Sequence, residues 1–591
     1  MVGIQIGNEF LDLPPGTVME IENANPFLQF NNEITGAFSL PFQVPATEKN
    51  LRLLQYAAIA QKKVTGNAID AIVYDNSLQL GIGKVKIEKA NINLNKIRKG
   101  VISCYFLQGS SNFFQDIKGK KIREINVGGN RVFNWDNYAA AGPGFSGHIT
   151  TVLNGAAGYG ASGYDYCFYP VINKAWPGVL LDPDCMNWCF LDGGIVKFGS
   201  DQVFYNGRNP NRYVPFPYLK YVLIKIFEYV GWELKGNILD DTYFKKITLI
   251  NFRGIDWCYV KKSGGNHQLV PHNIISFNLK DHLPDIDISA FLIAIKNRLG
   301  LWYDFDYYSK KATIKKVIES TSGSPADMTD KASPLLSKNI LQERKIYALR
   351  NMFATDLGDG APNFSLVDRE ADVNQINNLP AATEAQTGQC RLVVAENNFY
   401  ICRQNETTEA YQWEFFAYNI FDYEPAGFND EITTEATTVG VEVYNNYLDL
   451  IPRIDNQGER KGLVDDPESS WGIHLCFYHG HRDNKNGDPY PYASSHVYDS
   501  NMVQVADWAL AFECKKTDGS DVGLYELNWK PLLDILGSQE EFEATLRLNY
   551  IDYLALKFSH KINIAGIDLF IKQVKSSIPF SGSVSVSVVR L

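Results

Sequence analysis

The chain has 591 residues, too many for a single hydrophobic core, so several folded domains are expected. Its 67 Asp and Glu residues outnumber its 56 Lys and Arg residues, and the densest basic stretches, Lys96 to Lys99 and Lys118 to Arg123, are short. This balance argues against sequence-specific recognition of nucleic acid, although an acidic wall suits a conduit through which DNA passes without sticking.

Aromatic side chains are abundant, with 34 Phe, 32 Tyr and 10 Trp residues. This surplus favours β-rich cores and large buried interfaces, because each ring removes much area from water at a small entropic cost. The nine cysteines are scattered and odd in number, which favours a reduced, cytosolic origin. Met1 to Pro15 carries Glu9 and Asp12 and lacks the features of a signal peptide. No transmembrane segment is expected, since no stretch reaches the roughly 18 apolar residues required.

Residues 1–125 are predicted to form an N-terminal β module. The segment Phe38 to Pro45 is expected to be extended, because each proline disfavours helix in its predecessor. A short helix is expected over Lys49 to Ala60, and Asp75-Asn76-Ser77 predicts a hairpin turn. Further strands are predicted at Val18–Glu22, Ala68–Tyr74, Leu78–Ile87 and Val101–Leu107.

Residues 126–210 are rich in Gly, Asn, Tyr and Trp and show little periodicity, which predicts a loop-rich, aromatic inserted lobe. The lobe is either a contact surface or a decorated loop region. If the chain bound or degraded glycans, the region from Trp135 to Trp188 would supply a stacking platform.

Residues 211–320 are predicted to form an α+β module that contains one unit twice: an amphipathic helix, a glycine and an aromatic-rich strand. Gly231 ends the first helix, while Asp287 is the expected N-cap of the second and Gly300 its end. The apolar stripes are Leu219, Val222, Leu223, Ile226 and Val230 in the first helix and Ile288, Phe291, Leu292, Ile295 and Leu299 in the second. The repeat indicates either an internal duplication or two chance copies of a common unit.

Residues 321–500 are predicted to form a β-rich domain and residues 501–591 a C-terminal β module. Strands are expected at Cys390–Val394, Phe399–Arg403 and Tyr411–Phe416, and a short helix at Trp529–Leu536. At the end of the chain Val584, Val586 and Val588 alternate with serines, which predicts a half-buried strand. The whole chain is therefore expected to be mainly β (α+β) and multi-domain, with a few short amphipathic helices.

One glycine pattern, Gly158 to Gly163, matches a dinucleotide-binding fingerprint in form. Phosphate binding requires such glycines between a strand and the start of a helix. The residues that follow, Tyr164 to Pro170, have no helical stripe and meet a proline. Nucleotide binding is therefore not predicted.

The best metal candidate is the segment from His474 to His481. On a strand, His474 and Cys476 would share one face, and His479 and His481 another, so zinc or iron is one interpretation. The other, which we favour, is the aromatic-rich edge of a β-hairpin. Zinc is likewise the less favoured interpretation of Cys185 and Cys189, which stand in a turn region.

Paired carboxylates are the remaining route to catalysis. Asp304 and Asp306 would lie on one strand face, and Asp240-Asp241 stands in a turn, but nothing marks either pair as buried. No catalytic, cofactor-binding or metal-binding residue is assigned, and the chain is not expected to be an enzyme. Trp232, Trp302 and Tyr303 are candidate interface anchors or, equally, core residues.

Three passages resemble one family. They are Phe38 to Asn50, Pro215 to Trp232, and most closely His282 to Asp306; the strands expected over Lys561 to Leu591 accompany them. These passages are similar to ones in tail-tip and baseplate hub proteins of phages and prophages, particularly those of Bacteroidetes hosts. They are packing patterns rather than catalytic motifs.

The resemblance implies tube-like β-barrel or sandwich modules, two per subunit, in a homotrimeric ring at the tail tip, so that three chains match a sixfold tube. The implied partners are the tail tube or distal tail protein, the tape measure protein, and a spike, fibre or receptor-binding protein. The implied location is the virion, after assembly in the host cytoplasm. Many relatives carry a fused hydrolase domain that is not evident in this sequence. Alternatives are a distal tail ring, a fibre anchor, or a glycan-binding or glycan-degrading tail protein.

Overall fold

Strands dominate the computed structural model, and helices are few and short, so the fold is mainly β as predicted. The structure describes the chain except for residues 26–27, 29–37, 57–67, 92–99, 109, 135–144, 162, 174–184, 188, 193–194, 199–212, 264–265, 307–308, 322, 341–343, 352–374, 377–378, 388–389, 394–397, 406–407, 419–422, 424, 444–449, 455–470, 485–486, 496–507, 515–519, 538–539, 557 and 559–560.

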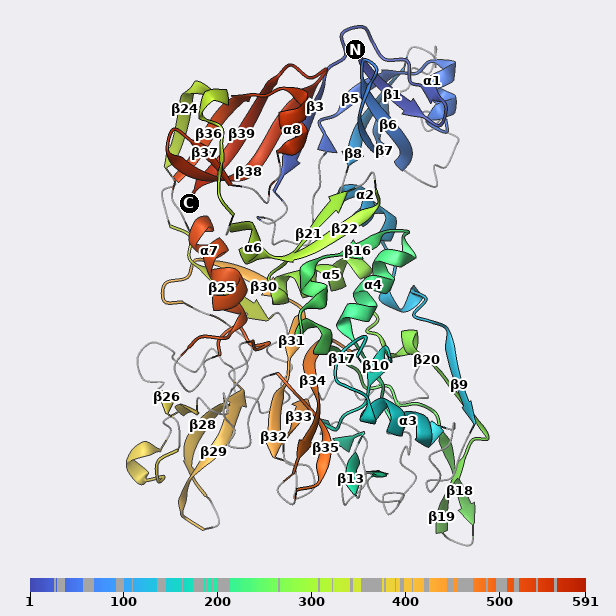
Figure 1. Cartoon of the computed structure of the whole chain (residues 1–591), viewed down its shortest axis with the longest axis vertical. Coiled ribbons are helices and arrows are strands. Elements are labelled where there is room, and N and C mark those ends of the chain that lie inside the picture. The colour runs from blue at the N-terminus through green and yellow to red at the C-terminus, as the bar shows by residue number, and fades with distance from the viewer. Residues whose placement is uncertain are drawn as a thin grey trace.

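A 14-stranded sheet built from both ends of the chain and from two strands of its middle, β23 and β24, lies at one end of the long axis (Figure 1). Its N-terminal part, the N-module, comprises β1 (Val2–Ile6), β2 (Glu9–Phe10), β3 (Met19–Ala24), β4 (Phe38–Ser39), β5 (Phe42–Pro45), α1 (Glu48–Leu53), β6 (Ala68–Asp75), β7 (Leu78–Asn91) and β8 (Val101–Gln108). Its C-terminal part, the C-module, comprises β23 (Ala326–Asp327), β24 (Ala332–Ile340), β36 (Glu540–Arg547), α8 (Tyr550–Ala555), β37 (Lys561–Ile564), β38 (Ile567–Ile578) and β39 (Ser583–Arg590).

Each module has its own apolar core on one face of the sheet. In β39 the side chains of Val584, Val586 and Val588 are fully buried while those of Ser583 and Ser585 are exposed, which confirms the predicted alternation. The short helices α1 and α8 each cover the apolar face of their module, where their side chains pack on the buried strand residues. The opposite face of the sheet is therefore left without a helix from either module.

The rest of the chain forms a central body around one large core. Its first half contains α2 (Ser110–Ile117), η3 (Ile122–Glu124), β9 (Asn130–Asn134), α3 (Phe145–Asn154), β10 (Tyr166–Cys167), β11 (Val171–Asn173), β12 (Cys185–Met186), β13 (Cys189–Asp192), β14 (Ile195–Phe198), β15 (Phe216–Pro217), α4 (Leu219–Tyr229), β16 (Glu233–Lys235), η5 (Asn237–Asp240), η6 (Phe244–Lys246), β17 (Ile247–Ile250), β18 (Cys258–Ser263), β19 (Asn266–Pro271), β20 (Ile274–Asn278), η7 (Leu279–His282), α5 (Ile288–Leu299), β21 (Leu301–Asp306), β22 (Lys311–Lys316) and α6 (Val317–Thr321).

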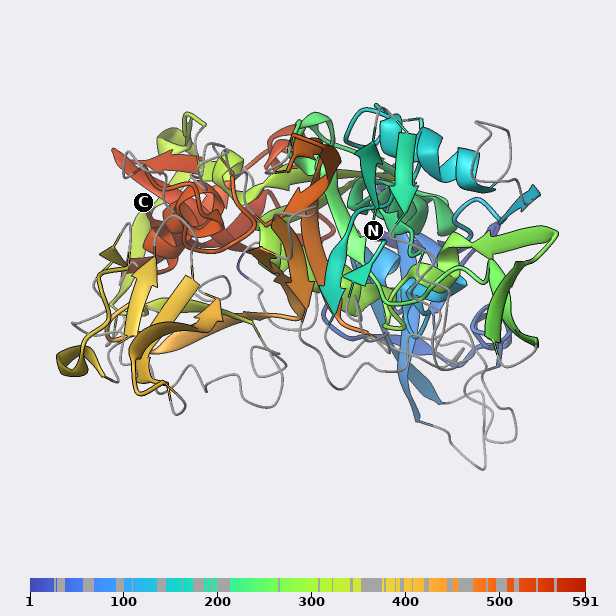
Figure 2. The same ribbon diagram turned by 90° about the horizontal axis from the view of Figure 1, so that it is seen from below.

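Its second half contains β25 (Tyr347–Asn351), β26 (Gln375–Ile376), η11 (Glu384–Gln386), β27 (Cys390–Val393), β28 (Asn398–Gln404), β29 (Tyr411–Tyr418), β30 (Asp430–Thr434), β31 (Ala436–Thr438), β32 (Gly440–Val443), β33 (Leu450–Ile454), β34 (Ile473–Asp483), β35 (Pro489–Ser494), the π-helix η12 (Tyr525–Trp529) and α7 (Lys530–Leu536). The short helix η8 (Thr329–Lys331) belongs to the C-module, between β23 and β24. The strands β28 and β29 and the hairpin β18–β19 lie at opposite sides of this body (Figure 2).

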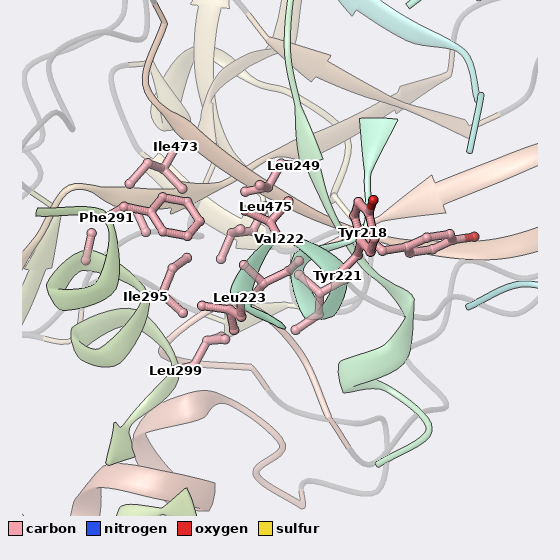
Figure 3. Close-up of a cluster of buried hydrophobic side chains, with 14 of the residues drawn as sticks. Tyr218, Tyr221, Val222, Leu223, Leu249, Phe291, Ile295, Leu299, Ile473 and Leu475 are labelled. Atoms are coloured by element: carbon pink, nitrogen blue, oxygen red, sulfur yellow. The ribbon is translucent and has the colours of Figure 1, made fainter. Parts of the chain in front are cut away.

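The two predicted amphipathic helices meet in the core of the central body (Figure 3). Val222 and Leu223 of α4 face Phe291 and Ile295 of α5, and strands β17 and β34 complete the cluster through Leu249, Ile473 and Leu475. Each predicted glycine follows its helix in the left-handed conformation. Both predicted strands form as well, but β16 and β21 pair with the same strand, β22. The two units therefore share one small sheet.

Three local expectations differ from the structure. Asp287 is the N-cap of α5, but its carboxylate makes no capping hydrogen bond and instead lies 3.2 Å from the Lys121 ammonium. Helix α1 ends at Leu53, because Gln55 and Tyr56 adopt left-handed backbone conformations; residues 57–60 of the expected helix lie outside the described residues. Helix α3 forms in the segment expected to be loop-rich, and its Ile149 is buried in the central core.

Polar contacts hold α5 in place although its surroundings are apolar. The Arg298 guanidinium donates to the carbonyl of Leu510 at 2.7 Å and lies 4.4 Å from the Phe512 ring centroid. The Asn528 side chain, on η12, donates to the carbonyl of Leu299 at 2.7 Å, which satisfies a backbone acceptor at the end of the helix. Removing such a buried partner costs more than the hydrogen bond contributes, so these contacts specify where α5 sits.

The two helix-ending glycines provide a matched pair of variants. A Cβ at Gly300 would lie 2.8 Å from the Cβ of Asn528, whereas a Cβ at Gly231 would meet no heavy atom within 4 Å. We expect Gly231→Ala to lower the free energy of unfolding by about 1 kcal/mol, through backbone strain alone. Gly300→Ala should lower it by about 2–4 kcal/mol, because overpacking adds to the strain. Urea denaturation followed by tryptophan fluorescence measures both; equal losses would contradict the packing of η12 against Gly300.

Burial of His148 makes the stability of the central body depend on pH. Its ring stacks on Phe133 and its Nε2 lies 2.6 Å from the Tyr166 hydroxyl. Burial, assisted by the charge of Arg131, lowers the pKa of His148 to about 4. The folded protein thus binds this proton less readily than the unfolded chain, so the stabilisation is present above about pH 6.5 and lost as the pH falls towards 4.

Between pH 7 and pH 5 the wild-type chain should therefore lose about 2 kcal/mol more stability than His148→Phe, which cannot titrate at this position. His282 and His474 are also buried with lowered pKa values and remain in both proteins, so the difference isolates His148. Urea denaturation at the two pH values measures it. An equal loss in both proteins would show that His148 is not held neutral.

Candidate functional site

The two end modules share one plan of strand connections. In the N-module β3 pairs with β4, β5 with β8, β6 with β7, and β7 with β8. In the C-module β24 pairs with β36, β36 with β39, β37 with β38, and β38 with β39. Strands β4 and β5 both pair with β8, as β36 pairs with β39, so β4 and β5 together correspond to β36. The strands β3 and β24 therefore occupy equivalent positions, as do β7 and β38.

The correspondence extends to a shared irregularity. The register of β7 against β8 shifts between Ile87 and Lys89, and that of β38 against β39 shifts between Ile571 and Gln573. The strand on the other side stops pairing one residue before each shift. Strand β6 pairs with β7 only as far as Lys86, and β37 pairs with β38 only as far as Phe570. Both strands thus have a β-bulge at the same place, so the two modules correspond residue by residue and not only strand by strand.

The helix of each module begins in the same way. Helices α1 and α8 have six residues each. Helix α1 follows β5, in which Phe42 lies opposite β8, and α8 follows β36, in which Phe542 lies opposite the equivalent position of β39. The side chains of Thr47 and Asn549 cap them by accepting a backbone N–H three residues ahead. The chain thus contains one supersecondary unit twice, once in the N-module and once in the C-module, where its first strand, β24, comes from the middle of the chain.

The two modules meet edge to edge through β3 and β38, which pair antiparallel along the whole of β3, from Met19 opposite Ile578 to Ala24 opposite Gln573. Asn25 extends this junction, since its backbone N–H donates to the carbonyl of Lys572 at 2.8 Å. Main-chain hydrogen bonds thus join the modules, and Ile578 of β38 packs in the apolar core of the N-module beside them.

The sheet face away from α1 and α8 is polar around this junction. Exposed hydroxyls of Ser583 and Ser585 line β39. Glu22 lies 3.4 Å from the Lys575 ammonium across the junction, and Glu541 lies 2.6 Å from that of Lys572. Because these lysines are paired with carboxylates, this part of the face presents no stripe of cations to a polyanion.

Two strand edges have no neighbour among the described strands. Among the described strands β24 pairs only with β36, and its Leu335, in the irregular part of the strand, is 74% exposed. β8 pairs with one side of β7 from Ile87 to Asn91, but on the other side, past the end of β6, no described strand lies beside these residues. An open strand edge is a template for pairing with another chain. These edges and the junction form the candidate site for assembly.

The predicted metal candidates are separated by the fold. His474 and Cys476 lie on β34 as expected, but the His474 ring packs against Phe252, and Cys476 lies near the Tyr169 hydroxyl. His479 Nε2 lies 3.1 Å from the Ser494 hydroxyl. In the part of the chain that the structure describes, no three His, Cys, Asp or Glu residues are grouped as metal ligands.

The carboxylate candidates have structural contacts. Asp241 accepts the backbone N–H groups of Tyr243 and Phe244 at 2.9 and 3.0 Å, and Asp240 lies 3.4 Å from two lysine ammoniums. Asp306 accepts the Ser309 hydroxyl at 2.7 Å. These contacts fit turns and strand ends rather than a catalytic pair.

The remaining candidates are core or turn residues. Trp232, Trp302 and Tyr303 are each 3% exposed and belong to the central core, so they are not available as interface anchors. The glycines from Gly158 to Gly163 lead into strand β10 rather than a helix. Cys185 is buried; Trp135 and Trp188, the ends of the proposed stacking platform, lie outside the described residues. No described helix is long and apolar enough to cross a membrane.

The equivalence of the end modules has almost no signal in the sequence. The hairpin turns are the one local cue: Asn76 and Ala565 both start two-residue turns with a positive φ. The open edges could not be found, because an edge is defined by the absence of a neighbour and not by residue type.

No protein-family model matches the chain, and no curated protein matches it. Solved structures similar to it over its full length include the 43 kDa tail protein of prophage MuSo2 from Shewanella oneidensis, a tail protein from Neisseria meningitidis MC58 and prophage tail protein gp18 from Listeria monocytogenes EGD-e. Each is 7% identical, with 100% of this chain and 95%, 95% and 94% of the other chain covered, at TM-scores of 0.32, 0.30 and 0.28. TM-scores this low establish neither a common fold nor a common function.

The junction between the modules can be tested by crosslinking within one chain. Glu22 and Lys575 are directly opposite each other, so Glu22→Cys combined with Lys575→Cys should form an intramolecular disulfide under mild oxidation. The control, Glu20→Cys with Lys575→Cys, is offset by two residues and should oxidise far more slowly. Peptide mapping by mass spectrometry distinguishes them; equal rates would contradict the register.

Proposed function

We propose that this chain is a structural protein of a phage-type tail, the hub at the tail tip. The observation that carries the proposal is the pair of equivalent β modules joined edge to edge within one chain. Three such chains present six equivalent modules, which is the number needed to continue a sixfold tube. The likeness of His282 to Asp306 and two other passages to tail-tip hub proteins points the same way.

In this proposal the protein functions through geometry rather than catalysis. The modules form a homotrimeric ring between the tail tube or distal tail protein and the spike, fibre or receptor-binding protein, with the tape measure protein inside the tube. The polar face bearing Ser583 and Ser585 lines the DNA exit path, where paired lysines avoid retaining the polyanion. The location is the virion tail tip, after assembly in the host cytoplasm.

The test is immunogold labelling of intact particles from the source lysate with an antibody raised to this chain. We expect gold confined to the tail tip. Gold along the tail, on the head, or on no particle would contradict the hub. Native mass spectrometry of the purified chain provides the second arm: three copies support the hub, while another closed number favours a distal tail ring.

A further inference from the structure

We propose that the stacked pair Tyr423 and Tyr525 is a site of oxidative crosslinking, at which a small one-electron oxidant joins the two rings as dityrosine. The bond ties strand β25, which Tyr423 contacts, to the π-helix η12, which supports the end of α5. This inference goes beyond the proposed function and does not rest on it, because it depends only on contacts within one chain.

The two rings lie very close together and nearly parallel. Their centroids are 3.6 Å apart, and the angle between the ring planes is 14°. Favourable aromatic pairs ordinarily have centroids roughly 4.5–7 Å apart. The two hydroxyls are hydrogen-bonded to each other, so both rings point the same way. The ortho carbons, which flank the hydroxyl in each ring and form the bond in dityrosine, are therefore stacked on one another.

The backbone holds both tyrosines in place. The N–H of Tyr423 donates to the carbonyl of Leu349 in β25 at 2.9 Å, and its carbonyl accepts from the N–H of Leu349 at 2.8 Å. The N–H of Tyr525 donates to the carbonyl of Phe512 at 2.9 Å, at the start of η12. π-Helices are rare and occur frequently at functional sites. Because both partners are held, the two rings react with each other rather than with distant tyrosines.

The surroundings of the pair favour loss of an electron. Both side chains are half-buried, so a small oxidant reaches them. Burial raises the pKa of both hydroxyls, and the negative charges of Glu513 and Asp534 raise it further, so both phenols stay protonated at neutral pH. The same charges stabilise an electron-poor ring. These exposed carboxylates can also accept the proton that leaves with the electron.

The reaction is a two-electron oxidation that balances. Each tyrosine loses one electron and its hydroxyl proton and becomes a tyrosyl radical. The two radicals form one carbon–carbon bond between ortho carbons, and the hydrogens on those carbons move to the oxygens, which restores both phenols. With persulfate as the oxidant, the two electrons break its peroxide bond and produce two sulfate ions, while two protons go to the solvent.

The bond constrains a part of the structure that other contacts specify only through hydrogen bonds. Helix η12 carries Asn528, whose side chain donates to the carbonyl of Leu299 at the end of α5. A covalent tie between positions 423 and 525 restricts the unfolded chain over the residues between them, as a disulfide of the same span does. The crosslinked chain should therefore unfold at a higher urea concentration than the untreated chain.

The test is photo-oxidation of the purified full chain with tris(bipyridyl)ruthenium and persulfate, at a protein concentration low enough to prevent links between copies. Peptide mapping by mass spectrometry locates the links. We expect the link between Tyr423 and Tyr525 to dominate, although the chain has 32 tyrosines. The control pair in the same molecule is Tyr550 and Tyr553, which are also half-buried but have ring centroids 6.5 Å apart. Its yield should be about tenfold lower.

Two single variants, Tyr423→Phe and Tyr525→Phe, keep an aromatic ring at each position but cannot form the bond. Each should lose both the link and the rise in the urea midpoint. A link between Tyr423 and Tyr525 that forms no faster than the one between Tyr550 and Tyr553 would overturn the inference, and this comparison requires no variant. An unchanged urea midpoint in the crosslinked wild-type chain would overturn the proposed tie between β25 and η12.

Discussion

The architecture depends on the backbone pairing between β3 and β38. A strand edge left open exposes main-chain donors and acceptors, and this chain uses one such edge from each module to satisfy the other. The residues that meet are far apart in sequence: the Asn25 side chain donates to the carbonyl of Ile571, across 546 positions. The two modules are thereby placed by hydrogen-bond spacing and by the twist of a continuous sheet, which tolerate little variation.

The central body packs against both modules. Phe570 and Val589 of the C-module pack into its core, and Phe113, which follows the last strand of the N-module, stacks on Phe227 with ring centroids 4.7 Å apart. Both modules are thus anchored to one apolar cluster as well as to each other. The buried Arg298 contacts fix α5 inside that cluster, so the support beneath the sheet is itself specified by polar groups.

Local pattern was enough to predict the elements whose burial follows one period. The stripe of α4 and the serine–valine alternation of β39 form as expected, because each reflects a one-sided apolar environment, and the glycines at 231 and 300 end their helices. The stripe of α5 is buried as well, but every residue from Phe291 to Leu299 is buried with it, so the pattern identified this helix and not its surroundings. Helix α3 was missed because its surroundings include glycine and aromatic residues on several sides, and its role is set by tertiary packing. Asp287 shows another limit: position identified the cap, but the nearby Lys121 decided where the carboxylate points.

The candidate site was less accessible to sequence reasoning than the fold. A repeated helix-Gly-strand unit stood out in the sequence, yet its two copies share β22, while the repeat that produces the junction has little residue identity. Phe42 and Phe542 are equivalent only once their partners on β8 and β39 are known. Pairing between distant strands depends on register and neighbours, which no local window contains.

The separation between β3 and β38 along the chain has a consequence for synthesis. At about 5–20 residues per second, a ribosome takes from roughly half a minute to two minutes to make the residues between them. During that interval the N-module can fold, but its β3 edge has no partner within its own chain. During this time β3 can contact the same unpaired edge on other nascent chains. A delay in translation or a holding chaperone would therefore change the yield of correctly closed subunits, even though the finished structure would be the same.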